Sequence, residues 1–276
     1  MAHEEILRRA ADAARDADAL LIGAGAGMGV DSGLPDFRGN QGFWRAYPVY
    51  AKLGLDFASM ANPRWFTKDP AFAWGFYGHR LELYRKTVPH AGFALLRKWA
   101  EGMKHGAFVF TSNVDGQFQK AGFSDDRIAE IHGSIHFVQC AMGCSGIAPA
   151  DPYRFDLDED TLRAQGELPR CACCAELLRP NILMFGDGWW DASRTEAQEA
   201  RLTTWLDGLG DARVVVIECG AGTAIPSVRM FCERLTRAGG TLVRINVREP
   251  QVPDGGIGVP MGALAALQGI DRALSH

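Results

Sequence analysis

The stretch GAGMGVDSGLPDFR, residues 25–38, decides the fold, because it joins a glycine-rich turn directly to a constrained polar loop. It follows the apolar run at residues 19–22, which we predict to be a buried strand that turns into a helix at the glycines. Glycines in this place are typical of nucleotide-binding folds, because backbone N–H groups can then close on a pyrophosphate. Met28 and Val30 stand where the G-x-G-x-x-G fingerprint would place its third glycine, so the stretch departs from that motif.

Length and composition indicate a globular chain with a sizeable core. The 276 residues suffice for one large domain, or for a large domain with a small insertion, and 47% of them are hydrophobic. A net charge of -4 argues against duplex-DNA binding, so we expect no sequence-specific nucleic-acid partner. The first 19 residues mix charges with alanines, which predicts an exposed helix and not a secretory signal. No apolar run approaches the roughly 18 residues of a membrane span, so we expect a cytoplasmic protein with no membrane partner.

Apolar runs typical of strands recur along the chain with helix-like stretches between them, at residues 19–22, 107–111, 214–218 and 241–247. This alternation predicts an α/β fold with a doubly wound, parallel, Rossmann-like sheet. Two stretches interrupt it: residues 43–86 are rich in aromatics and predict a helical lobe, whereas residues 140–174 carry prolines and an acidic run. We predict two domains. The larger, Rossmann-like domain is made of residues 1–42, 87–139 and 176–276, and the smaller domain is made of residues 43–86 and 140–175.

Five of the seven cysteines crowd into residues 140–174. Cys140 pairs with Cys144 and Cys171 with Cys174 at short spacings, which in a reducing compartment favours a metal over disulfides. Four thiolates can close a tetrahedral zinc site with no open position, so the predicted zinc is structural. The fifth thiol, Cys173, could replace Cys171 or Cys174, and the alternative of ordinary unliganded thiols stays open.

His132, in the segment IHGS at residues 131–134, is the candidate acid–base group. An imidazole titrates near neutral pH and can take a proton from a sugar hydroxyl as that oxygen becomes a nucleophile. A single histidine is more often structural, and we assign that role to the others, which are His3, His79, His90, His105, His136 and His276.

Asn113 and Asp115 follow the predicted strand at residues 107–111, in the segment TSNVDG. Ligands of open α/β sheets bind at the carboxyl ends of the strands, so we expect both side chains near a ligand. The alternative is that they are ordinary turn residues.

The motifs together resemble the sirtuins, the NAD-consuming protein deacylases. The resemblance rests on SGLPDFR at residues 32–38, on TSNVD at 111–115, which is similar to the family's Thr-Gln-Asn-Ile-Asp, and on HGS at 132–134. It continues through LRPNILMFGD at residues 178–187 and the glycine turn at 220–224, in the family order. The chain also has features of the bacterial desuccinylase-like branch.

The resemblance implies two cofactors, NAD and zinc, and it favours Cys171 and Cys174 over Cys173 as zinc ligands. The residues that it places around NAD are Gly25, Ala26, Gly27, Asp36, Phe37, Arg38, Ser112, Asn113, Asp115, Gly220, Gly222 and Asn246. His132 would be the general base, and Asn113 a second catalytic residue. In the family reaction the acyl oxygen displaces nicotinamide and the histidine then activates a ribose hydroxyl. The products are free lysine, nicotinamide and an O-acyl-ADP-ribose.

The implied partner is an acylated lysine in a protein or peptide. Ile182, Leu183, Phe185 and Gly186 match the family stretch that pairs with the peptide as an added strand, although a plain edge strand would look similar.

Tyr77 and Arg80 share a helix face and resemble the Tyr-x-x-Arg pair of sirtuins that remove succinyl, malonyl or glutaryl groups. Ala61 falls at the small residue that widens their pocket. Alternatively, Tyr77 packs in the interior while Arg80 meets solvent.

Three positions depart from the family pattern: Gly29, Ser112 and Phe118 stand where the family usually has Ser, Gln and His. The missing Gln removes a hydrogen bond worth about 0.5 to 1.5 kcal/mol, which would retune NAD handling without abolishing it. These departures keep an alternative open, an NAD-dependent ADP-ribosyltransferase or NAD glycohydrolase on the same fold. A module that senses NAD without turnover is a further alternative, and the oligomeric state stays open.

Overall fold

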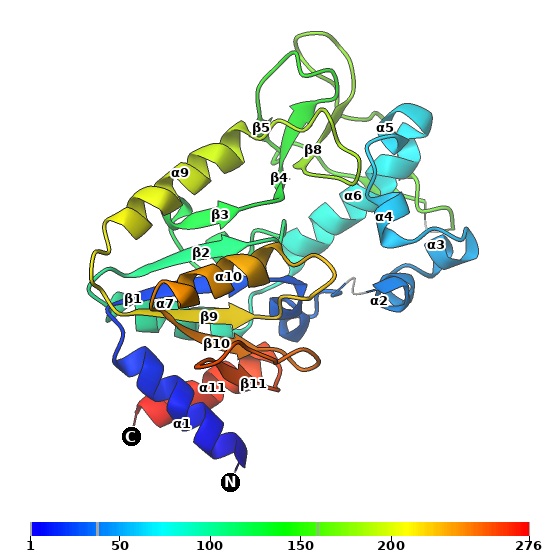
Figure 1. The fold of residues 1–276 in the computed structure, drawn as a ribbon. Helices are drawn as coiled ribbons and strands as arrows, with labels where there is room; N and C mark the ends of the chain where they lie inside the picture. The colour runs from blue at the N-terminus through cyan, green and yellow to red at the C-terminus, as the bar shows by residue number, and fades with distance from the viewer. Residues whose placement is uncertain (1, 37–38, 159, 276) are drawn as a thin grey trace.

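The computed structural model describes residues 2–36, 39–158 and 160–275 (Figure 1). Its centre is a six-stranded sheet in the order β11-β10-β9-β1-β2-β3, in which all neighbours are parallel. The strands are β1 Ala19–Ala24, β2 Ala107–Thr111, β3 Ile128–Glu130, β9 Val214–Cys219, β10 Thr241–Ile245 and β11 Ile257–Val259. The strands predicted from the apolar runs are therefore confirmed, as is the parallel α/β class.

Helices cover both faces of this sheet, because neighbouring residues of a strand point to opposite sides. Leu20 and Ile22 of β1 join the core on one face, whereas Leu21 joins the core on the other. The helices of the first face are α1 Ala2–Arg15, α7 Ala91–Glu101 and α11 Ala263–Leu274, and those of the second are α9 Ser193–Asp207 and α10 Ser227–Arg237. Figure 1 shows α10 in front of the sheet and α7 behind it.

The amino-terminal helix is exposed on one side only. Its residues Ala10 and Ala11 are fully buried in the same core as Leu267 of α11, so α1 is packed on the fold. Among the described residues, no helix combines the length and the apolar character that a membrane crossing requires.

The glycine turn after β1 does not lead into an α-helix, so that expectation is wrong. Two 3₁₀ turns, Ala26–Met28 and Val30–Ser32, follow β1, and the second ends at Gly33 with a φ of 86°. Glycines at positions 27, 29 and 33 lower the helix propensity of the stretch, and a left-handed residue ends it. The chain then reaches Pro35 at the edge of the predicted binding region.

In the part of the chain that the structure describes, the remaining region combines four short helices and one long helix with two small antiparallel sheets, in the upper right of Figure 1. Its helices are α2 Gly39–Ala46, α3 Pro48–Lys52, α4 Phe57–Met60, α5 Trp65–Lys68 and α6 Pro70–Lys86. Its strands are β4 Gly133–Cys140, β5 Ala148–Pro149 and β8 Leu178–Ile182 in one sheet, and β6 Asp156–Leu157 and β7 Ala164–Gln165 in the other. The division of the chain into two domains at the boundaries given above stays a prediction.

Aromatic side chains fill the core of this helical region. Phe43 stacks on Tyr50 at a centroid distance of 5.6 Å and meets Phe76 edge-on at 6.0 Å. The same core includes Phe72 and Tyr77 of α6. One wall of the cavity described in the next subsection is built on this aromatic core.

Candidate functional site

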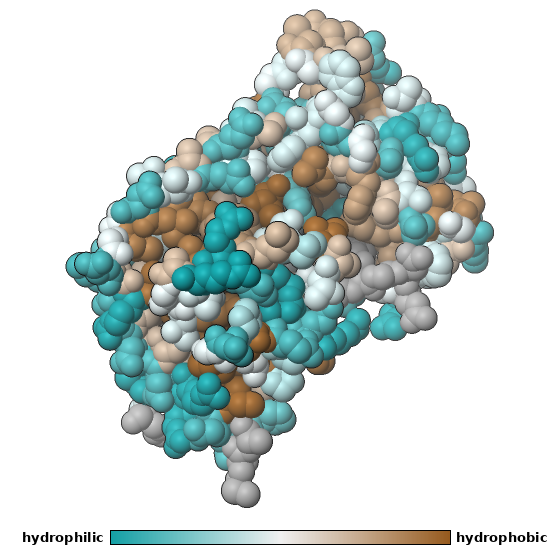
Figure 2. Space-filling model, in the orientation of Figure 1, coloured by the Kyte–Doolittle hydropathy of each residue, from teal (hydrophilic) through white to brown (hydrophobic). Residues whose placement is uncertain are grey.

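A cavity of about 650 Å³ opens where the carboxyl ends of β1, β2 and β9 face the helical region. Apolar surface gathers between the sheet and the helices in this part of the molecule (Figure 2). The predicted site residues that line the cavity are Gly25, Ala26, Asp36, Ala61, Tyr77, Arg80, Ser112, Asn113, Asp115, His132, Ile182, Leu183, Phe185 and Gly222. The structure therefore brings together residues from positions 25 to 222 of the chain.

Four predicted residues do not line this cavity: Gly27, Gly186, Gly220 and Asn246. Phe37 and Arg38, also predicted to contact NAD, lie outside the described residues.

The two glycine turns pack backbone against backbone. A Cβ atom on Gly25 would lie 2.7 Å from the Cα of Ala221, and one on Gly220 would lie 2.3 Å from the carbonyl carbon of Gly27. The amide of Gly27 also donates a hydrogen bond of 3.1 Å to the carbonyl of Gly220. Gly27 and Gly220 thus hold the turns together, while Ala26 and Gly222 face the cavity. This close contact places the loops after β1 and β9 side by side, as a cradle for a phosphate would require.

Asn113 is fixed at the edge of this cradle. Its side-chain amide donates to the carbonyl of Gly25 at 3.0 Å, and its backbone amide donates to Oγ1 of Thr111 at 3.0 Å. Thr111 donates in turn to the carbonyl of Ala24. These bonds tie the loop after β2 to the turn after β1, so the Asn113 amide has a defined orientation at the cavity.

His132 lies just after β3, where its side chain lines the cavity. Burial lowers the pKa of the imidazole below its ordinary 6.5, and a hydrogen bond with the backbone of Ser112 acts in the opposite direction. The imidazole is therefore neutral at neutral pH. A neutral imidazole can accept a proton, which is the property that a general base needs.

Asp115 is a buried carboxyl in the cavity wall. Burial raises its pKa from 3.8 to about 6, although one carboxylate oxygen accepts a hydrogen bond from the amide of Gln117. The ring of His136 contacts the Asp115 carbonyl at 2.9 Å and lies against Gly116. His136 therefore supports the loop that carries Asp115, in agreement with the structural role we expected for it.

Helix α6 brings Tyr77, Arg80 and Tyr84 to the cavity, because residues three and seven apart share a helix face. Arg80 is 5% exposed, so the alternative in which it meets solvent does not apply. Its Nε and Nη2 atoms donate to the phenol oxygen of Tyr84 at 3.1 and 2.9 Å, and its guanidinium lies 5.2 Å from the ring of Phe76. The sequence-based prediction missed Tyr84, which the helical spacing after Arg80 could have indicated.

The segment after β8 runs along the cavity and is fixed by hydrogen bonds within the chain. The amide of Leu183 donates to the carbonyl of His132, and the amide of Phe185 donates to the carbonyl of Ala61 at 2.9 Å. The Phe185 carbonyl accepts a bond from the side chain of Asn62 at 3.0 Å. A peptide added as a strand here would therefore pair through backbone groups other than those of Phe185. Its pairing with this segment stays a prediction.

Asp187 holds the same segment in place through an ion pair and backbone hydrogen bonds. Its carboxylate is buried and pairs with the guanidinium of Arg179, which is buried as well. It also accepts hydrogen bonds from the amides of Met184 and Trp189, at 3.3 and 3.1 Å. The backbone from 183 to 187 is thus anchored to β8 by one buried ion pair.

Asn246 follows β10 and braces two loops of the cavity without lining it. Its side-chain amide donates to the carbonyl of Ala221 at 2.8 Å, and its side-chain oxygen accepts from the amides of Arg248 and Glu249 at 3.1 Å each. Arg248 and Glu249 do line the cavity. The sequence-based prediction missed these two residues, although their place after a parallel strand is a signal that could have found them.

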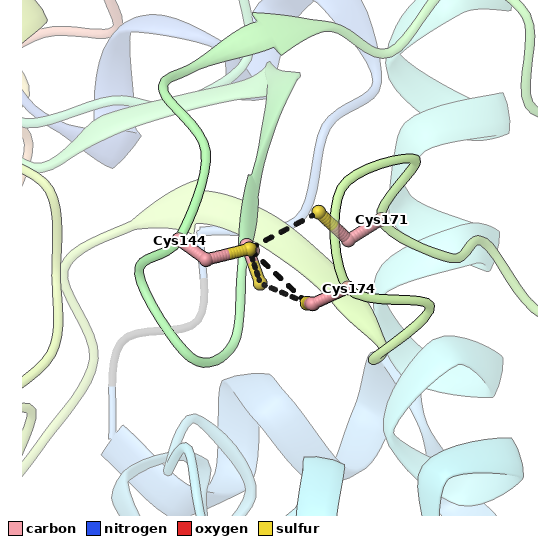
Figure 3. Close-up of side chains that lie close together, drawn as sticks. Cys144, Cys171 and Cys174 are labelled. Carbon is pink, nitrogen blue, oxygen red and sulfur yellow. Dashed lines mark hydrogen bonds between the residues drawn. The ribbon is translucent and has the colours of Figure 1, made fainter.

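The thiols of Cys140, Cys144, Cys171 and Cys174 converge at the end of β4 (Figure 3). Their sulfur atoms all lie within 4.8 Å of one another, and the contact of Cys144 with Cys174 is 3.1 Å. A tetrahedral zinc ion with bonds of about 2.3 Å would hold its sulfurs about 3.8 Å apart, so the cluster needs little adjustment to close on zinc. Cys173 is exposed and lies outside the cluster. The four cysteines predicted as ligands are the ones that the structure brings together.

At two of the positions that depart from the sirtuin pattern, Gly29 and Phe118, apolar side chains occupy the space. A Cβ atom on Gly29 would lie 3.0 Å from Cδ1 of Leu34, so that side chain occupies the available space. Phe118 packs edge-on against Phe93 at a centroid distance of 4.9 Å. A polar side chain at either position would displace this packing.

Comparison with known proteins agrees with this geometry. The Sir2 family model matches residues 25–215. The NAD-dependent protein deacylase of Pyrococcus furiosus is 33% identical over 81% of this chain and 79% of its own length. That of Methylococcus capsulatus is 29% identical, over 85% and 84%. A solved structure described as a Sir2 homolog–NAD complex shares the fold with a TM-score of 0.69 at 22% identity, over 96% of this chain and 94% of its own. The chain belongs to the Sir2 family, as the resemblance to the sirtuins implied.

Proposed function

We propose that this chain is an NAD-dependent protein lysine deacylase that releases nicotinamide and an O-acyl-ADP-ribose. The observation that carries the proposal is that His132 lines one cavity together with Ala26 and Gly222 of the cradle and with Tyr77 and Arg80 of α6. A site of this kind can hold a dinucleotide on one side of the general base, His132, and an acyl chain on the other side. The relatives named NAD-dependent protein deacylase support the same reading.

The cradle residues fit NAD. A pyrophosphate needs close approach of backbone amides, and the loops around Ala26 and Gly222 meet at a contact that only glycines at 25 and 220 permit. NAD supplies, when bound, a nicotinamide–ribose bond whose cleavage activates the acyl group. In this reading Asn113 and Asp115 hold the nicotinamide end, and Arg248 and Glu249 lie near the other end.

His132 acts as the general base. Its neutral imidazole would take the proton of a ribose hydroxyl as that oxygen attacks the acyl carbon, and its partly buried position in the cavity limits the access of competing water. Asn113 is oriented toward the same space by its bond to the turn after β1 and positions the reacting groups.

The acyl group is acidic in this proposal, of the succinyl, malonyl or glutaryl class. Tyr77 is 1% exposed, and among the described residues its hydroxyl has no hydrogen-bond partner. A buried hydroxyl without a partner costs about 1 to 3 kcal/mol, so a ligand atom that accepts its proton would be favoured here. Arg80 lines the same part of the cavity and adds positive charge, which selects a carboxylate.

Replacing Arg80 with Met tests this acyl class. A guanidinium in a partly desolvated channel contributes about 1.5 to 3 kcal/mol through hydrogen bonds to a charged group, so the ratio of kcat/KM for succinyl-lysine over acetyl-lysine should fall about tenfold or more. Arg97→Met, on the surface of α7, is the control and should leave the ratio unchanged. Equal loss on both peptides, or loss on neither, would contradict the role of Arg80.

An ADP-ribosyltransferase or NAD glycohydrolase is the second candidate. It is favoured by the apolar packing of Gly29 and Phe118 at positions where the family pattern is polar. Both activities cleave the nicotinamide bond, and neither requires transfer of an acyl group. The reaction products therefore separate the two candidates.

The zinc ion has a structural role in this account, held by Cys140, Cys144, Cys171 and Cys174 with no position open for water. We place the protein in the cytoplasm, where a reducing environment keeps these thiols available for the metal.

A further inference from the structure

Tyr84 occupies a place in the acyl end of the cavity that the Tyr77–Arg80 pair alone does not explain. It is 5% exposed, and it lines the cavity one helical turn beyond Arg80. Its phenol oxygen accepts two hydrogen bonds from one guanidinium, from Nε at 3.1 Å and from Nη2 at 2.9 Å. The Tyr84 carbonyl accepts a further bond from the side chain of Gln117, which fixes the end of α6 against the loop of Asp115.

These contacts determine what the Tyr84 hydroxyl can still do. A hydroxyl oxygen has two lone pairs and one proton, and the two N–H groups of Arg80 use both lone pairs. Burial raises the pKa of Tyr84, so the phenol keeps its proton at neutral pH. The proton is the only hydrogen-bonding capacity left to the group, so Tyr84 can serve as a donor to a ligand in the cavity that it lines.

The same contacts fix the orientation of Arg80. A guanidinium presents its donors in a planar fork, and the edge formed by Nε and Nη2 is taken by the phenol. The rings of Phe76 and Tyr77 lie 5.2 and 5.8 Å from the guanidinium carbon and restrict the remaining freedom. Arg80 is therefore held in one orientation before any acyl chain enters.

We propose that Tyr84 is a specificity-determining residue, which holds the Arg80 guanidinium by its Nε edge and donates its own proton to the carboxylate of an acidic acyl chain. The inference rests on the proposed deacylase function. A carboxylate has about four acceptor positions, so it can take bonds from Tyr77, Arg80 and Tyr84 together. An acetyl group offers no charged oxygen to these donors, and the gain from Tyr84 is confined to acidic chains.

The test is Tyr84→Phe, which removes the oxygen and keeps the ring. We expect the ratio of kcat/KM for succinyl-lysine over acetyl-lysine peptide to fall about tenfold, because a hydrogen bond to a charged group is lost. The loss should appear mainly in KM for the succinyl peptide, since the carboxylate is remote from the reacting carbon. A thermal unfolding transition of the variant, compared with that of the wild type, checks that the variant is folded under the conditions of the assay.

Tyr50→Phe is the matched control. Tyr50 is another fully buried tyrosine whose hydroxyl has no hydrogen-bond partner among the described residues, and it is not part of the cavity wall. This variant should keep the wild-type ratio. A Tyr84→Phe ratio within about twofold of wild type would overturn the proposal.

The double variant Arg80→Met/Tyr84→Phe separates direct donation from orientation of Arg80. If Tyr84 donates to the acyl carboxylate, the double variant loses at least about threefold more on succinyl-lysine than Arg80→Met alone. No further loss would overturn the direct contact, because Tyr84 would then act only through Arg80. Failure of the proposed function gives a different result, which is seen in the wild-type protein. The wild-type protein would then turn over neither peptide, or it would turn over only the acetyl-lysine peptide.

Discussion

The six-stranded sheet and the helical region that faces it are built in different ways. The sheet repeats one pattern, in which buried strands such as β1 and β9 pair over six residues and alternate their side chains between two cores. The helical region is irregular: its helices range from four residues in α4 to 17 in α6, and its strands from two residues in β5 to eight in β4. Specific side chains hold it together, namely aromatic rings around Phe43 and four thiols at the end of β4. Regions with few buried contacts open locally at a lower free energy than a well-packed sheet, so we expect the two regions to differ in local stability.

The cavity takes one wall from each region. Ala26, Ser112 and Gly222 come from strand ends of the sheet, and Tyr77 and Leu183 come from the other region. In the proposed function, the sheet presents the residues that would hold the dinucleotide, while the helical region presents those that would hold the acylated peptide. Disturbing the helical region should therefore affect activity through the peptide wall first.

Removal of zinc should have the largest effect. A structural zinc site contributes on the order of 10 kcal/mol to folding in small modules, so a chelator or the Cys171→Ser/Cys174→Ser change should unfold the region that the thiols hold. Hydrogen exchange should show lost protection in β4 and β8, with β1 and β9 still protected.

The control for zinc is Cys173→Ser, which changes an exposed thiol outside the cluster. It should leave exchange and metal content at wild-type values. A metal-free protein with full protection in β4 would contradict the structural role of the cluster.

Asp187→Ala should be next in size. The change removes the carboxylate that pairs with Arg179, whose side chain is only 2% exposed. Leaving this guanidinium buried and unpaired should lower the free energy of unfolding by about 3 to 5 kcal/mol. Denaturant unfolding should report this loss. Asp126→Ala is the matched comparison, because Asp126 is 82% exposed and pairs with Arg201 at the surface, where a pair is worth about 0 to 1 kcal/mol. Equal losses in the two variants would show that burial of the pair has no consequence.

His132→Ala should reduce turnover at least about 100-fold, the lower range for a positioned general base. The protein should stay folded, because the change removes a cavity side chain. Since burial lowers the pKa of His132, the wild-type rate should persist below pH 6.5 and fall only as the imidazole becomes protonated. His3→Ala, on the surface of α1, serves as the control. Near-normal deacylation by His132→Ala would remove the residue from the mechanism.

Asp115→Asn should give the smallest effect, a gain in stability that depends on pH. The folded pKa of about 6 lies above the ordinary 3.8, so the charged carboxylate is penalised by burial above pH 6. The penalty is relieved as pH falls through 6 and the folded protein takes up a proton. Asn should therefore stabilise the protein by about 1 to 3 kcal/mol at pH 7.5 and by much less at pH 4.5. An effect independent of pH would contradict the raised pKa.

The sequence predicted four of the six strands of the sheet, because strands of a parallel sheet are apolar runs that are visible without tertiary context. The four predicted runs did not include β3 and β11, which have only three residues each. Cysteine spacing predicted a cluster of thiols, and the family resemblance selected Cys171 and Cys174 over Cys173, which agrees with the four thiols that the structure brings together. The places of Asn113 and His132 after strands, with the same resemblance, predicted that both lie at the cavity. The sequence failed where a residue's role depends on a neighbour distant in the chain. Gly27 and Gly220 pack on each other and do not line the cavity, and nothing in either turn alone indicates that contact.

Tyr84 illustrates the same limit on the helical side. Its contact with Arg80 was readable from the spacing of four residues within α6, but that both residues line the cavity depends on how α6 packs against the loop after β2. The prediction of an α-helix after β1 was wrong for a local reason, because the glycines at positions 27, 29 and 33 favour turns.

The most direct test of the central claim is mass spectrometry of the products formed from NAD with acetyl-lysine, succinyl-lysine and unmodified lysine peptides. We expect nicotinamide and O-acyl-ADP-ribose in equal amounts from the acylated peptides, with more product from succinyl-lysine and none from unmodified lysine. Nicotinamide release without O-acyl-ADP-ribose, or a peptide that gains the mass of ADP-ribose, would contradict deacylation and establish the transferase or glycohydrolase in its place.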